Sequence, residues 1–221
     1  NPLIICDLTD FFKEVDFPAF KDKPVRGIVA GCQGKSKKFF EDSLKYATSA
    51  EVGLGGLGYI TLKDGVFAGP IAKFLSDAQK EEIISLTNVK EGETLFFICD
   101  ETKNNTEKKA GLIRTWLAKH EQLDLIDNDA FEFCFVVDFP MYENDEETGE
   151  TIFTHNPFSM PQGGMDALLN KDPLEIFAYQ YDIVCNGVEL SSGAVRNHNP
   201  EIMKKAFEIA GYGEEDVKAK F

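Results

Sequence analysis

The sequence predicts an α+β protein built from two successive units. Between residues 23 and 128, strand-like and helical patterns alternate. From residue 129 onward, a long apolar run indicates a buried strand, and Asn186-Gly187 indicates a β-hairpin. The chain has 221 residues, of which 43% are hydrophobic, so it can bury a sizeable core.

The composition is that of a globular protein from a reducing compartment. No apolar run reaches the roughly 18 residues of a membrane span, and no signal peptide is recognisable, so we expect a cytoplasmic location. Five widely spaced cysteines without a CxxC pair predict free thiols, and with only three histidines they argue against a zinc site.

The charge balance limits the range of partners. The 38 acidic residues outnumber the 23 basic ones, which gives a net charge of −15 and repels phosphate backbones. The chain by itself is therefore not expected to bind nucleic acid broadly. It begins at Asn1 without a methionine and ends in a charged helical pattern, so we expect a piece of a longer protein.

The first unit should contain three strands and three helices. Strand-like patterns cover 25–31, 56–62 and 94–100, and helical patterns cover 36–48 and begin near Ser76 and Thr106. Ser76 and Gln79 have the spacing of a capping box, which marks a helix start. Ala110, Ile113 and Leu117 fall on one face of the last helix.

The segment GLGGLG at 53–58 matches the dinucleotide fingerprint letter for letter. That fingerprint requires the glycines to follow a strand and to open a helix, so that pyrophosphate meets the helix N-terminus. Here the glycines follow a helical pattern and precede a strand. We therefore interpret them as a connection and not as a nucleotide site.

The second unit begins with the run FEFCFVVDFP at 131–140. It is apolar at nearly every position, which predicts a strand buried on both faces and ended by Pro140. The segment 143–151 is acidic and rich in turn formers, so it should be the exposed tip of a β-excursion. Prolines and paired glycines predict that 155–173 is largely an irregular loop of the kind often kept for function.

A hairpin and a helix should complete the second unit. Asn186-Gly187 favours a type I′ turn, which needs positive φ at both central residues. The last helix has Asn199 as its N-cap, Pro200 at its first position and Gly211 beyond its end.

The second hairpin strand carries two charges, Glu189 and Arg196. Their separation is odd, so in a regular strand they would point to opposite faces. A bulge at Ser191-Ser192-Gly193 would add one residue and bring both charges to one cleft. A structural ion pair or an exposed strand end is the alternative interpretation.

Three further polar residues are candidates for a site or for structural roles. Arg196 can bind a carboxylate or phosphate through two parallel hydrogen bonds, or it can pair with a local acid such as Asp182. His155 opens the long loop, where a histidine can bind a ligand or serve structure. Asp138 lies at the end of the buried strand. It either caps the strand end or supports the site residues without contacting the ligand.

Several long motifs occur in an order that carries a resemblance. FVVDFPMYE at 135–143, THNPFSMP at 154–161 and the stretch from Ala178 to Tyr212 resemble the C-terminal part of the catalytic domain of bacterial-type aspartyl-tRNA synthetases. The unit containing GLGYITL and GPIAKFL resembles the GAD domain that is inserted into that enzyme and shared with a subunit of tRNA-dependent amidotransferases.

The resemblance covers essentially the whole chain and implies a domain organisation. Residues 1–22 would connect from the catalytic domain, and residues 23–128 would form a GAD-type α/β insertion unit. Residues 129–221 would be part of a class II synthetase antiparallel β-sheet with flanking helices.

The resemblance also implies roles for three residues. Arg196 would bind the side-chain carboxylate of substrate L-aspartate, and His155 would contact the amino acid. Glu189 would bind ATP through Mg²⁺, for which a hard oxygen ligand is suited. The implied reaction forms aspartyl-adenylate and then transfers aspartate to the 3′ end of tRNA(Asp), in a full-length homodimer.

This chain departs from the family pattern at two motifs. His155-Asn156 stands where two histidines are common, and Ser191-Ser192-Gly193 stands where three glycines are common. These differences affect fine specificity more than the reaction.

The family's motifs 1, 2 and 3 and its anticodon-binding barrel are missing from this sequence. The chain alone is therefore expected to be inactive, and no catalytic residue is assigned in it. The alternative from another class is a non-catalytic GAD-type module that contacts tRNA or serves as a scaffold.

Overall fold

The structure, a computed structural model, describes residues 3–145 and 147–213. The chain divides into two compact units, Asn1–Asn128 and Asp129–Phe221. Within the described residues, no helix is both long and apolar enough to cross a membrane.

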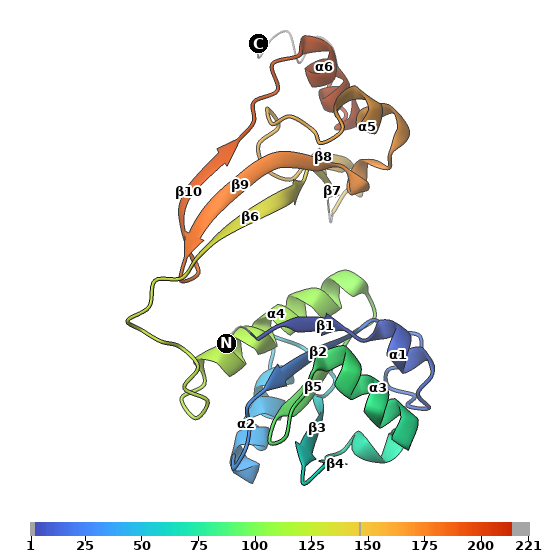
Figure 1. The fold of residues 1–221 in the computed structure, drawn as a ribbon. Helices are drawn as coiled ribbons and strands as arrows, with labels where there is room; N and C mark the ends of the chain where they lie inside the picture. Colours follow the sequence, from blue (N-terminus) through green and yellow to red (C-terminus); the bar gives the residue numbers. More distant parts are fainter. Residues whose placement is uncertain (1–2, 146, 214–221) are drawn as a thin grey trace. The chain divides into compact units, whose positions relative to one another are not determined.

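The first unit is a five-stranded antiparallel sheet with helices on both faces (Figure 1). The strand order is β1-β2-β5-β3-β4. Its elements are β1 (Ile5–Asp7), α1 (Thr9–Lys13), β2 (Val25–Ala30), α2 (Lys37–Ala47), β3 (Gly58–Lys63), β4 (Val66–Ala68), η1 (Ala72–Phe74), α3 (Asp77–Thr87), β5 (Thr94–Cys99) and α4 (Lys103–Lys119).

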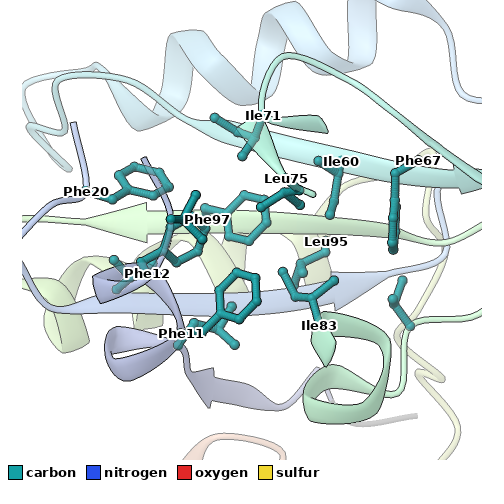
Figure 2. Close-up of a cluster of buried hydrophobic side chains, with 14 of the residues drawn as sticks. Phe11, Phe12, Phe20, Ile60, Phe67, Ile71, Leu75, Ile83, Leu95 and Phe97 are labelled. Carbon is teal, nitrogen blue, oxygen red and sulfur yellow. The ribbon is translucent and has the colours of Figure 1, made fainter. Parts of the chain in front are cut away.

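Two hydrophobic clusters fill this unit, one on each face of the sheet. Helices α1 and α3 cover one face, where Phe12 packs against Phe97 of β5 and Ile83 belongs to the same cluster (Figure 2). Helices α2 and α4 cover the other, where Phe39 and Ile113 belong to the same cluster as neighbouring β-strand residues. Side chains alternate along β5, so this central strand contributes to both clusters.

The start of the chain is an integral part of this unit. Strand β1 pairs with β2, and Leu8, Phe11 and Phe12 are buried in the core beside α3. The segment 1–22, which the sequence analysis treats as a connector, therefore supplies an edge strand and a helix to the first unit.

Local signals in the first unit are confirmed. Ser76 and Gln79 form the reciprocal hydrogen bonds of a capping box at the start of α3. The glycines at 53–58 connect α2 to β3, as predicted. Helix α4 begins earlier than the predicted Thr106, because the Thr102 hydroxyl accepts a hydrogen bond from the Asn105 amide and caps the helix there.

The second unit has a three-stranded antiparallel sheet of order β10-β9-β6 and a separate β7-β8 hairpin (Figure 1). A small core around Tyr142 joins the hairpin to α5 and α6. The elements are β6 (Phe133–Pro140), β7 (Tyr142–Asn144), β8 (Thr151–Phe153), α5 (Gly164–Asn170), η2 (Pro173–Glu175), β9 (Phe177–Cys185), β10 (Val188–Ala194) and α6 (Pro200–Ile209).

The prediction that the strand at 131–140 is buried on both faces is wrong for the described chain. Phe135 is 67% exposed, and Phe133 and Val137 are also exposed. Helices α5 and α6 pack around Tyr142, and no described element covers these side chains.

The loop prediction for 155–173 also needs correction. The paired glycines do not exclude regular structure, because Gly163 is the N-cap of α5 and Gly164 is its first residue. Both have positive φ, so they turn the chain sharply into the helix.

Other predictions for this unit are confirmed. Residues 143–145 and 147–151 of the acidic segment lie in the β7-β8 hairpin and its turn. Asn186 and Gly187 both have positive φ between β9 and β10. The Asn199 side chain accepts hydrogen bonds from the first amides of α6, and Pro200 occupies its first position.

Candidate functional site

Strand β10 contains the bulge that the charge spacing predicts. Glu189 pairs with Val184 and Ser191 pairs with Ile183, so Leu190 is an extra residue without a partner. The bulge thus lies at Leu190 and not in the Ser-Ser-Gly segment, which pairs regularly. The extra residue changes which face of the sheet the following residues of β10 occupy, so Ser192 shares a face with Glu189.

The small residues that follow the bulge are required by packing and do not form the bulge. A Cβ atom on Gly193 would lie 2.4 Å from the ring of Tyr181, its cross-strand partner. Glycine there lets the tyrosine ring lie directly over the strand. The Ser-Ser-Gly segment is therefore explained by packing against β9.

A pocket of about 390 Å³ opens on the face of the sheet that carries Glu189. Strands β9 and β10 form one wall, and the start of the long loop forms another. The lining side chains are Phe139, His155, Asn156, Gln180, Asp182, Glu189 and Ser192.

Two carboxylates face this pocket. Asp182 pairs with Ser192 and Glu189 pairs with Val184, and the bulge puts all four side chains on one face. From the sequence alone, Asp182 is expected only as a possible partner of Arg196. Its place beside Glu189 follows from combining the turn at Asn186-Gly187 with the bulge, since together they set the cross-strand register.

His155 reaches the pocket from the loop. Its ring makes an edge-to-face contact with Phe139, with centroids 5.1 Å apart. Asp138, which has φ +58°, precedes that phenylalanine at an irregularity between β6 and β9. The Asp138 carboxylate accepts a hydrogen bond from Gln162 Nε2 at 2.8 Å, so it holds the loop and does not line the pocket.

Arg196 lies just beyond the end of β10. Its backbone forms an isolated bridge with Ser159 of the long loop. Its guanidinium carbon is 5.5 Å from the centre of the Phe158 ring, and Arg196 is not among the residues that line the pocket. The structure therefore joins His155 and Glu189 in one pocket, and Arg196 does not line it.

The donor set of the pocket suits a hard cation that carries phosphates. Mg²⁺ in such sites is usually bound by one or two carboxylates, with the remaining positions taken by water and phosphate oxygens. Asp182 and Glu189 supply two carboxylates of this kind. No cluster of three or more metal-ligating side chains occurs among the described residues, so a cation held by protein groups alone is not indicated.

A larger cavity of about 740 Å³ lies in the first unit, but its chemistry is different. Its walls are mainly apolar, with Phe40 and Tyr59 stacked at 4.5 Å. The lining lysines Lys23 and Lys37 each pair with a neighbouring acid that also lines the cavity. The pocket of the second unit is smaller, yet it alone of the two gathers the predicted site residues.

Comparison with known protein families gives a match over nearly the whole chain. Residues 10–221 match the family described as tRNA synthetases class II (D, K and N).

Curated relatives named aspartate–tRNA(Asp/Asn) ligase match all of this chain. The one from Paramagnetospirillum magneticum is 53% identical over 227 residues, and that from Rickettsia bellii is 47% identical over 232 residues. A third, from Zymomonas mobilis, is 51% identical over 227 residues. The chain spans 25% of the first relative, 38% of the second and 37% of the third.

Proposed function

The chain belongs to the class II tRNA synthetases of the D, K and N group, and on this premise we propose that the full-length protein is an aspartate–tRNA ligase. It would activate L-aspartate with ATP and transfer the aspartyl group to the 3′ end of tRNA(Asp). The observation that carries this proposal is the identity of 47–53% with aspartate–tRNA(Asp/Asn) ligases over the whole chain.

In this proposal the pocket of the second unit binds ATP. Asp182 and Glu189 face the same opening, so they can hold Mg²⁺ together with the phosphate oxygens. The bound ion would neutralise charge on the phosphates. The two carboxylates would hold the ion at a defined position relative to the phosphates, because both project from paired strands of one sheet.

Arg196 is proposed to bind the side-chain carboxylate of aspartate. A guanidinium near an aromatic face, as here beside Phe158, can keep its in-plane N–H groups for a bidentate contact. His155 would contact the same amino acid from the loop. These residues act by positioning and by charge stabilisation.

The reaction requires two displacements on the bound substrates. The α-carboxylate of aspartate attacks the α-phosphate of ATP, forming the adenylate and releasing pyrophosphate. A hydroxyl of the terminal tRNA ribose then attacks the activated carbonyl and releases AMP. The first step depends on the pocket described here, and both steps need groups from the rest of the full-length protein.

We assign residues 23–128, with the edge strand and helix that the preceding segment adds to the same unit, to a GAD-type insertion domain, and residues 129–221 to part of the catalytic domain. The motif order and the break between compact units at Asn128 support this assignment. The apolar side chains of β6 are exposed in this chain. This exposure supports the proposal that other segments of the full-length protein cover this sheet. A cytoplasmic homodimer is the proposed assembly.

Pyrophosphate exchange tests the proposed function. The full-length protein should exchange labelled pyrophosphate into ATP only when L-aspartate is added, whereas the 221-residue chain alone should not. Exchange driven by another amino acid, or none at all, would contradict the proposal. Activity of the chain alone would contradict the inferred need for the missing motifs.

A variant pair connects that assay to the pocket. Glu189→Gln removes a proposed Mg²⁺–ATP ligand, so kcat/KM for ATP should fall at least about 10-fold. Glu143→Gln changes an exposed glutamate of β7 that does not line the pocket and should leave the rate unchanged. Equal effects of the two substitutions would remove Glu189 from the ATP site.

A further inference from the structure

The loop that carries His155 is attached to the sheet in two different ways. From Phe158 onward it runs beside the strands as an added strand. The Met160 amide donates to Val195 O at 2.8 Å, the Asn197 amide donates to Phe158 O at 2.7 Å, and the Tyr179 amide donates to Met160 O at 2.9 Å.

The two residues at the pocket, His155 and Asn156, lack this backbone attachment. Among the described residues, no main-chain hydrogen bond joins either of them to β9 or β10. Their polar link to the sheet is one side chain: Gln180 Nε2 donates to Asn156 O at 3.1 Å. The His155 ring makes an edge-to-face contact with Phe139 on β6.

Gln180 is well placed to act as this anchor. It is 8% exposed, so its rotamer is restricted by packing, and it projects from β9 on the same face as Asp182, two residues away. One strand therefore carries both a pocket carboxylate and the contact that fixes the opposite wall. The Asn156 side chain completes the arrangement by accepting a hydrogen bond from the Phe158 amide at 3.0 Å.

We infer that Gln180 is a positioning residue, which sets His155 and Asn156 at a fixed distance from the carboxylates of the pocket. This inference rests on the proposed function and adds a residue to it. A misplacement of about 1 Å in a binding wall can cost roughly 100-fold in rate, so one anchoring hydrogen bond can have a measurable effect. Gln180 acts through the loop and not through a contact of its own with aspartate.

The test uses the full-length protein and aspartate-dependent pyrophosphate exchange. Gln180→Leu removes the donor, and Gln180→Met removes it with little change in length and without adding a charge to the pocket. Both should raise the KM for aspartate about 10-fold and change the KM for ATP by a smaller factor. Tyr179→Phe, at the neighbouring residue on the other face of β9, is the matched control and should change neither KM.

A double-mutant cycle separates positioning from direct contact. If Gln180 acts through the loop, Gln180→Leu should cause little further loss in a His155→Ala background. Additive losses, or an unchanged KM for aspartate in either Gln180 variant, would overturn the inference. An inactive wild-type protein would instead reject the proposed function, so the two failures can be told apart.

Discussion

Strands β5 and β6 are similar in sequence and opposite in environment. In β5, Phe96 and Phe97 are buried, whereas Phe133 and Phe135 of β6 are exposed. Strand β5 lies in the middle of a five-stranded sheet with helices on both faces, while β6 is the edge of a three-stranded sheet. An apolar strand pattern thus predicts that the side chains are buried in the complete protein. It does not predict which segments pack against them.

The largest expected difference between the units is the cost of losing a phenylalanine. Phe97→Ala should lower the free energy of unfolding by about 3–5 kcal/mol, because it opens a cavity in a packed core. Phe135→Ala should change it by less than about 0.5 kcal/mol, since that ring is 67% exposed.

Urea unfolding measures both effects. Fluorescence of Trp116, the only tryptophan of the chain, reports on the first unit, and far-UV circular dichroism reports on both units. A comparable cost for the two substitutions would mean that β6 is covered in this chain after all.

Thiol reactivity gives the next largest difference. Burial raises the pKa of Cys32 to about 11, while Cys134 on β6 is exposed. The thiolate is the reactive form, so at pH 8 alkylation of Cys32 should be slower by at least about 100-fold.

Mass spectrometry after timed alkylation resolves the two sites. Cys99 provides a second comparison, because burial also raises the pKa of its thiol to about 11. Slow labelling of Cys134 would argue that chains associate through the exposed sheet.

A smaller effect is expected in the core of the second unit. The Tyr142 hydroxyl donates to Ala206 O at 3.0 Å and so links β7 to α6. Tyr142→Phe should cost this unit about 1 kcal/mol in the free energy of unfolding, measured by circular dichroism.

The same substitution should change the response of stability to alkaline pH. Burial raises the pKa of the Tyr142 phenol, so the folded protein keeps its proton where the unfolded chain loses it, above about pH 10. Stability should therefore fall with rising pH in that range, and less so in Tyr142→Phe. Identical pH profiles would show that this phenol ionises equally in both states.

The features that the sequence predicted correctly depend on residues close together in the chain. The capping box at Ser76, the turn at Asn186-Gly187 and the cap at Asn199 involve groups within four residues of one another. Their hydrogen bonds form wherever the segment folds, so the pattern suffices to place them.

The features that the sequence missed depend on distant strands. The bulge was expected for the correct reason, strand parity, but its place at Leu190 is set by the register with β9. The same register places Asp182 beside Glu189, and the contact between Gln180 and Asn156 requires the loop to return to β9. Such pairings cannot be read from periodicity along one segment.

Arg196→Lys in the full-length protein tests the proposal that the second unit carries the aspartate-binding part of a synthetase. A point charge cannot reproduce a bidentate contact, so kcat/KM for aspartate in pyrophosphate exchange should fall at least about 10-fold. Arg114→Lys, on an exposed position of α4, is the matched control and should leave the rate unchanged. Unchanged kinetics for Arg196→Lys would contradict the proposal.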